Sequence, residues 1–234
     1  DARPISDAVA AEWRAQGDAV VPASMPLLRL ANTAIDGITA NRDQTIAAIL
    51  RLGQNDLLCY RADAPPALVR RQCEGWDRWI AWADRVLGAK LRVVEGLIHA
   101  DQPVEAQAAL HDAVARQDDF ALAGLHVIAS ITGSLVLGRA VARGELSADD
   151  AVALSCFEEA HQAETWGTDA EAEARARRPS GPGASAGRRS ARRPSRSRLK
   201  ATASWAMAWR FNSSVMASAS DRSDFMNFSR AGVA

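Results

Sequence analysis

The sequence predicts an all-α protein: a single helical domain of six or seven helices over residues 1–178, packed around a buried central helix, and a low-complexity, disordered basic tail over residues 179–234. Three observations support this prediction. Residues that start and stop helices recur at short intervals as far as residue 178. Residues 120–138 contain no charged side chain, which is typical of a helix surrounded by other helices. From Pro179 onward, Ser, Gly, Pro and Arg replace the periodic apolar pattern.

The average composition hides two segments of opposite charge. The chain has 234 residues, of which 48% are hydrophobic and 24% are charged, so it is long enough to form a sizeable core. Residues 1–174 hold 15 of the 28 basic side chains and 26 of the 28 acidic ones, whereas residues 175–234 hold the other 13 and 2. The formal net charge of zero is therefore a cancellation between an acidic domain and a basic tail.

Cysteine usage favours an intracellular protein without a metal centre. Cys59, Cys73 and Cys156 are an odd number, and their spacing matches no zinc or redox motif. The chain does not open with a basic segment followed by an apolar run, so no secretory signal is expected.

Residues that commonly start and end helices predict three short helices in the first 53 residues. Each begins at a residue that commonly caps helices and ends at a glycine. Because each is short, its stability must come mainly from packing. The first runs from the N-cap Ser6 to Gly17, the second from Ser24 and Pro26 to Gly37, and the third from Asn41, which with Gln44 resembles a capping box, to Gly53.

A fourth helix follows a short extended or turn segment at residues 57–60. Pro65 and Pro66 set its entry. Tryptophans three residues apart favour packing against a neighbouring helix, and an exposed platform for stacking bases or sugars is the alternative. The stripe that we expect to pack contains Leu68, Gln72, Trp76, Trp79 and Trp82.

The central helix comes after a short strand at residues 91–94 and a fifth helix that Pro103 opens and that runs through Val114. The uncharged segment 120–138 has 19 positions, the length of a membrane span. Its glycines, hydroxyls and histidine make it only modestly hydrophobic, so we interpret it as a buried helix, with membrane insertion as the alternative. This helix is expected to continue to Gly144.

The last predicted helix begins at Ser147, which forms a capping box with Asp150, and it continues at least to Arg177. Four of its residues share one face, because the helix rotates by about 100° per residue. Such a line is either the polar rim of a groove or a set of buried polar groups that need partners. The four residues are Leu154, Glu158, Gln162 and Trp166.

Motifs that would indicate catalysis are missing from the sequence. Glu158 and His161 have the Glu-x-x-His spacing of di-iron helix bundles, but no second copy occurs, so we expect His161 to be solvated and predict no metal site. The sequence also lacks a phosphate loop, a dinucleotide fingerprint, a zinc-protease motif and a nucleophile elbow. We therefore expect no catalytic residues, no cofactor and no enzymatic activity.

The basic run at residues 188–200 supports an alternative function. Its arginines could neutralise phosphate groups, so a nucleic-acid-associated protein acting through its Arg/Ser-rich tail is the second hypothesis. Two simpler interpretations are a flexible basic tail and a non-native extension read out of frame. The abrupt change of composition near Arg178, inside a promising helix, motivates the second of these.

Five separated motifs between residues 5 and 175 carry a family resemblance. They are Glu12-Trp13-x-x-Gln16, Met25-Pro26-Leu27-x-x-Leu30-x-Asn32-Thr33-x-x-Asp36, Asp56-x-x-Cys59-Tyr60-Arg61, Leu68-x-x-x-Gln72-x-x-x-Trp76-Asp77-x-x-x-x-Trp82 and Glu158-x-x-x-Gln162-x-x-x-Trp166-Gly167. In order and spacing they resemble the assembly chaperones that handle the alpha subunit of the F-type ATP synthase, namely the mitochondrial F1 complex assembly factor 2 and its bacterial relatives. Each motif alone is weak, but five in the right order are specific.

The resemblance implies an ATP-independent chaperone that binds the unassembled alpha subunit, prevents its aggregation and releases it when the catalytic hexamer forms. It implies contact with this client at Glu158, Gln162, Trp166 and Glu159. Structural or binding roles are implied for Trp13, Asn32, Asp36, Tyr60, Arg61, Trp76 and Asp77, with packing as the expected role of Trp13.

The resemblance also implies differences from the family and a location. Family members usually begin with a β-rich N-terminal domain, which is expected to be missing here, and Arg78 stands where a proline commonly follows the Trp-Asp pair. Their C-terminal helix continues where this chain turns to Pro179. The bacterial cytoplasm is the expected location, and the mitochondrial matrix is the alternative.

Overall fold

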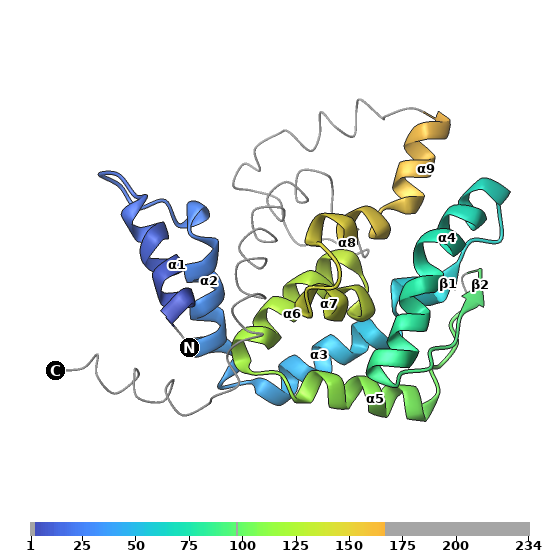
Figure 1. Ribbon diagram of the computed structural model, residues 1–234, viewed down its shortest axis with the longest axis horizontal. Coiled ribbons are helices and arrows are strands. Elements are labelled where there is room, and N and C mark those ends of the chain that lie inside the picture. The colour runs from blue at the N-terminus through green and yellow to red at the C-terminus, as the bar shows by residue number, and fades with distance from the viewer. Residues whose placement is uncertain (1–2, 97, 167–234) are drawn as a thin grey trace, which may run out of the picture.

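The computed structural model describes residues 3–96 and 98–166, and this part of the chain is mainly helical, as predicted. These residues form nine α-helices, more than the six or seven that we expected, and Figure 1 shows how they are arranged. Residues 167–178 and the predicted tail at 179–234 lie outside the described residues. The helices are α1 (Arg3–Arg14), α2 (Pro26–Asn32), α3 (Arg42–Gln54), α4 (Pro66–Trp82), α5 (Val104–Ala115), α6 (Asp119–Thr132), α7 (Leu135–Ala142), α8 (Ala148–Ser155) and α9 (Phe157–Trp166).

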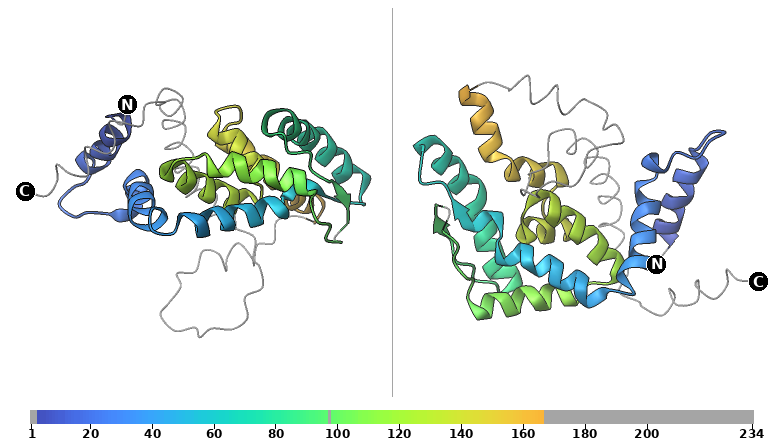
Figure 2. Two further views of the ribbon diagram at one scale, coloured as in Figure 1. Left: turned by 90° about the horizontal axis from the view of Figure 1, so that it is seen from below. Right: turned by 180° about the vertical axis from the view of Figure 1, so that it is seen from behind.

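Helices α1 and α2 form a hairpin that projects from the rest of the molecule, as all views in Figures 1 and 2 show. The carboxylate of Glu12 on α1 accepts hydrogen bonds from the backbone N–H groups of Leu27 (2.8 Å) and Leu28 (2.9 Å), and so caps the first turn of α2. The N-caps predicted for these two helices are wrong. Ser6 lies inside α1, and Met25 rather than Ser24 precedes α2.

Helix α3 begins after Asn41 as predicted, but without the capping box. The Asn41 amide donates instead to the carbonyl of Gly37 at 3.0 Å. The next residue, Arg42, joins α3 to the α5–α6 connection: it donates to the carbonyl of Ala115 at 3.0 Å and forms an ion pair with Asp119. This contact satisfies carbonyls at the end of α5 and orients α6 against α3.

Helices α6 and α7 form the centre of the core, packed against α3 and α8. The burial predicted for residues 120–138 is confirmed for most of the segment, but the single helix is wrong. Gly133 has a left-handed φ of 67°, which ends α6, and the Ser134 hydroxyl accepts the N–H of Leu137 at 3.1 Å to begin α7. None of the described helices is both long and apolar enough to cross a membrane.

The break between α6 and α7 is held by a buried carboxylate. Asp56 accepts the backbone N–H of Leu58 at 3.1 Å and that of Val136 at 3.0 Å. Its side chain is fully buried, and burial raises its pKa to about 6 against the opposing effect of these hydrogen bonds. Asp56 thus joins the turn before the first strand to the start of α7.

Helix α4 buries the predicted stripe of Leu68, Gln72, Trp76, Trp79 and Trp82, which confirms the packing interpretation of the tryptophans. The turn at residues 57–59 leads into β1 (Tyr60–Arg61), which pairs in parallel with β2 (Val94–Glu95). The strand expected at residues 91–94 is therefore shorter and begins later. The fifth helix follows Pro103, as predicted.

The last predicted helix is divided in two. Ser147 is the N-cap, as predicted: its hydroxyl accepts the N–H of Asp150 at 3.1 Å and donates to the Asp150 carboxylate at 2.6 Å. Helix α8 then ends at Ser155, and α9 starts after Cys156 in a new direction (Figure 1). This bend turns α9 toward α4, so that residues far apart in the sequence meet.

Candidate functional site between helices α4 and α9

Two aromatic rings join α9 to α4. The Phe157 ring stacks on Trp76 with the ring centroids 5.8 Å apart and the planes 6° from parallel. Trp76 is 1% exposed, and its indole N–H donates to the carbonyl of Leu154 at 2.9 Å. One side chain of α4 therefore contacts both the end of α8 and the start of α9.

Gly75 makes this close contact possible. A Cβ atom at this position would lie 2.4 Å from Cε2 of Phe157 and 3.2 Å from Cδ2 of Leu154. The sequence contains this signal, because a glycine inside a helix marks a site where another element approaches closely. Neither Gly75 nor Phe157 is among the site residues predicted from the sequence.

We expect Gly75→Ala to lower the free energy of unfolding by about 2 kcal/mol. Pushing Phe157 away from the added methyl group costs up to about 3 kcal/mol, and alanine returns roughly 1 kcal/mol in a helix. Urea unfolding measures the change, with Cys73→Ala, at an exposed position of the same helix, as the control. A Gly75→Ala protein as stable as the parent would show that α9 does not pack on α4 in this way.

Arg61, in strand β1, lies next to Trp76 of this aromatic pair. Its side chain is buried and donates from Nε to the carbonyl of Leu58 at 2.9 Å and from Nη1 to the carbonyl of Gln72 at 3.1 Å. Its Nη2 atom lies 2.8 Å from Oδ1 of Asp77, and its guanidinium carbon lies 5.2 Å from the centre of the Trp76 ring. The structure thus brings Arg61, Trp76 and Asp77 together, although two separate motifs supply them.

Gln72 extends this network to α9. Its side chain is fully buried, and its amide oxygen accepts the N–H of Ala62 at 2.8 Å. Its amide nitrogen donates to Oε1 of Glu158 at 3.4 Å. Glu158 is half-buried, so it has one side toward this network and another toward solvent. The sequence left two interpretations open: the polar rim of a groove, and a set of buried polar groups with partners. Glu158 has features of both, because it is half-buried and its carboxylate is bonded to Gln72.

The outer part of α9 carries exposed polar side chains. Arg71 of α4 holds both carboxylate oxygens of Glu164, at 3.1 and 3.0 Å, and these hydrogen bonds lower the pKa of Glu164. Glu159 and Gln162 are exposed, and the side chain of Trp166 lies outside the described residues. The face of α9 thus changes from a half-buried start to an exposed end.

The remaining predicted residues do not reach this site. Trp13, Asn32 and Asp36 are exposed on or next to the α1–α2 hairpin, at the other end of the molecule from α9 (Figure 1). Trp13 is 47% exposed, so the packing role expected for it is wrong in this structure. Tyr60 lies nearer, but its hydroxyl is 3.1 Å from Nδ1 of His99, on the side of the β2 connection.

The chemistry available at this site is that of packing and polar contact. In the described part of the chain, no three His, Cys, Asp or Glu side chains lie close enough to hold a metal ion. The nearby thiol of Cys59 is buried, and burial raises its pKa, which disfavours the nucleophilic thiolate. The fold and this site therefore define a class of protein: a helical protein with a rigid, partly polar surface suited to contact with another molecule.

Comparisons with known proteins identify the family. A family model described as ATP12 chaperone protein matches residues 1–84. The crystal structure of Atp12 from Paracoccus denitrificans matches with 40% sequence identity and a TM-score of 0.76, covering 89% of this chain and 81% of that chain. A putative chaperone from Agrobacterium tumefaciens matches with 46% identity and a TM-score of 0.69, covering 74% of this chain and 65% of that one. The chain belongs to the ATP12 chaperone family.

Proposed function

We infer that this protein is an ATP-independent assembly chaperone that binds the unassembled alpha subunit of the F1 part of ATP synthase and prevents its aggregation. The observation that carries this proposal is the continuous network from Asp77 through Arg61 and Gln72 to Glu158. It joins three of the motifs on which the family resemblance rests into one site, which ends at the surface of α9.

The packing of α9 supports a role in binding. The buried Trp76 and the half-buried Phe157 hold α9 rigidly against α4. Along this helix, Glu158, Glu159 and Gln162 supply polar groups of the kind found at the rim of protein interfaces. Holding a client requires binding alone, so we propose no catalytic residue and no cofactor. The bacterial sources of the two related structures support the bacterial cytoplasm as its location.

We expect Glu158→Ala to weaken binding of the isolated alpha subunit at least tenfold, which corresponds to about 1.4 kcal/mol. The carboxylate is held by the Gln72 amide, so it is presented to a client without a large ordering cost. Co-purification and suppression of alpha-subunit aggregation are the two measurements. Glu105→Ala, at an exposed acidic position in the first turn of α5, is the matched control.

Two outcomes would contradict parts of the proposal separately. If the parent chain neither co-purifies with the alpha subunit nor suppresses its aggregation, the proposed function is wrong. If the parent, Glu158→Ala and Glu105→Ala proteins all bind equally, the function stands and the role of Glu158 is wrong.

A further inference from the structure

A second polar cluster lies where α4 meets α7, on residues that the family resemblance does not include. Trp79 and Arg139 are each only 7% exposed. The indole N–H of Trp79 and the Nε–H of Arg139 are both buried without a hydrogen-bond acceptor. A buried donor without an acceptor is unfavourable, and more so when it is charged. Two such donors in one region indicate that an acceptor belongs there.

The carboxylate of Glu145, at the end of the turn after α7, is already occupied. Glu145 accepts the indole N–H of Trp82 at 2.6 Å and Nε of Arg143 at 2.8 Å. These two hydrogen bonds lower the pKa of Glu145, as expected for a carboxylate that is fully engaged. In the described residues, Glu145 therefore neutralises Arg143, and Arg139 forms no ion pair of its own.

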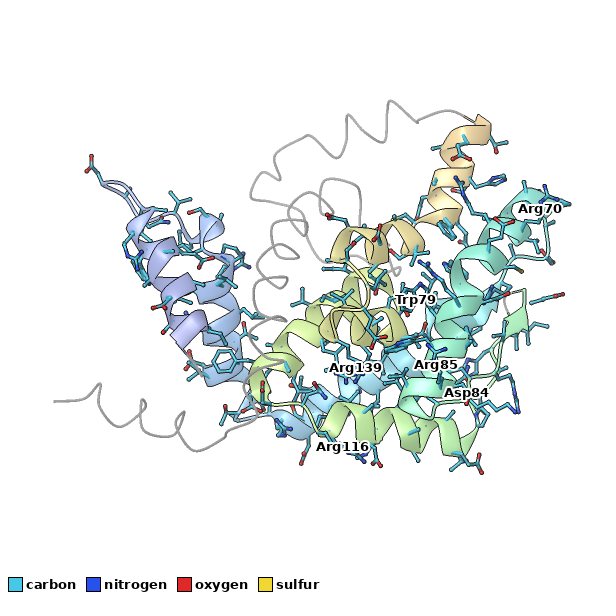
Figure 3. The ribbon with its side chains drawn as sticks, viewed as in Figure 1. Arg70, Trp79, Asp84, Arg85, Arg116 and Arg139 are labelled. Atoms are coloured by element: carbon cyan, nitrogen blue, oxygen red, sulfur yellow. The ribbon has the colours of Figure 1, made fainter. Side chains whose placement is uncertain are left out.

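Several positive charges meet at this point. Burial, together with the charge of Arg143, lowers the pKa of Arg139 to about 10, which still leaves Arg139 charged at neutral pH. Arg85 acts on Glu145 from the π-helical turn Ala83–Leu87 that follows α4. In the view of Figure 3, Trp79, Arg85 and Arg139 are drawn in the region between α4 and α7, with Asp84 next to Arg85, whereas Arg70 and Arg116 lie on the outside. Arg139 and Arg143 together carry more positive charge than Glu145 balances.

A carboxylate fits these donors better than a neutral acceptor would. It accepts charge-assisted hydrogen bonds from an arginine edge, and its second oxygen can accept from an indole N–H. Desolvation strengthens such a pair, because the guanidinium is already removed from water. The domain is rich in acidic residues, yet none of the described ones pairs with Arg139.

We propose that Arg139 and Trp79, flanked by Arg85 and Arg143, bind a carboxylate supplied by an acidic side chain of the client protein. The identity of the client rests on the function proposed above, whereas the binding of a carboxylate does not. The chaperone would then hold its client at two places along α4: near Gln72 and Trp76 through α9, and near Trp79 through Arg139.

The test uses the full chain labelled with ¹⁵N, with sodium acetate as the probe. The indole N–H signal of Trp79, assigned with Trp79→Phe, reports on this site, and the Arg139→Met protein distinguishes acetate bound here from acetate bound elsewhere. We expect acetate to shift this signal in a saturable way in the parent and in Arg70→Met, an exposed arginine of the same helix. Arg139→Met should weaken this binding at least tenfold and leave the urea midpoint equal or higher, because it removes a buried charge without an ion-pair partner.

A parallel arm measures binding of the alpha subunit to the same three proteins, and a tenfold loss is expected for Arg139→Met alone. The proposal is overturned if acetate does not move the Trp79 signal, if Arg139→Met lowers stability, or if Arg139→Met binds the alpha subunit as well as the parent does. Tighter binding of inorganic phosphate than of acetate would overturn the assignment to a carboxylate. A saturable acetate shift in a parent that fails to bind the alpha subunit would support the site and reject the proposed function.

Discussion

Replacing Trp76 by alanine is expected to lower the free energy of unfolding by about 3–5 kcal/mol. The indole is 1% exposed and contacts both the guanidinium of Arg61 and the ring of Phe157. Its removal leaves a large cavity and also leaves the carbonyl of Leu154 without its donor. Because α9 rests on this side chain, client binding should fall together with stability. Urea unfolding followed by circular dichroism measures the change.

Trp13→Ala is the matched control, since this tryptophan is 47% exposed on α1. We expect its free energy of unfolding to stay within about 1 kcal/mol of the parent value. Trp76→Phe retains a ring but not the indole N–H, so it should lie between the parent and Trp76→Ala. Equal stability of Trp76→Ala and Trp13→Ala would show that Trp76 does not organise the contact between α4 and α9.

The second large effect concerns pH and the buried carboxyl group of Asp56. Burial raises its pKa from 3.8 to about 6, so the folded protein holds this proton more tightly than the unfolded chain. The stabilisation from this proton is complete below about pH 4 and is lost as the pH rises through about 6. The total is about 3 kcal/mol, because one pKa unit equals about 1.4 kcal/mol. Many carboxylates change stability in the opposite direction, because salt bridges lower their pKa.

Asp56→Asn isolates this effect, because asparagine does not titrate. The difference in unfolding free energy, parent minus Asp56→Asn, should fall by up to about 3 kcal/mol between pH 4 and pH 7 and stay constant above pH 7. Urea unfolding at several pH values measures it. A difference that instead rises with pH would mean that the hydrogen bonds from Leu58 and Val136 outweigh burial and lower the pKa of Asp56.

Helix α4 connects the two proposed contact sites. Gln72 and Trp76 on its buried stripe lie toward α9, and Trp79 and Trp82 continue the stripe toward α7 and Glu145. The tryptophans predicted as core are indeed core, but their indole N–H groups have different roles. That of Trp76 bonds to Leu154, that of Trp82 bonds to Glu145, and that of Trp79 is left without an acceptor.

Local signals in the sequence located most helices but not all of their ends. Gly133 followed by Ser134 is a stop and start signal, yet it lies within the uncharged segment 120–138, where the apolar pattern continues on both sides. Ser6 and Ser24 are good caps by residue type, but the carboxylate of Glu12 performs the capping of α2 from another helix. A side chain that arrives from elsewhere in the fold leaves no mark in the local pattern.

By itself, the sequence determined the helical class, the burial of the α4 stripe and of most of residues 120–138, and the family, because these depend on residue types and on spacing within single segments. Only the tertiary structure decided that Arg61, Gln72 and Glu158 form one network, that Trp13 is exposed, and that Trp79 and Arg139 are buried without acceptors. Gln72 and Glu158 are 86 residues apart. Their meeting depends on the bend after α8 and on the space left by Gly75, which arise from how the helices pack together.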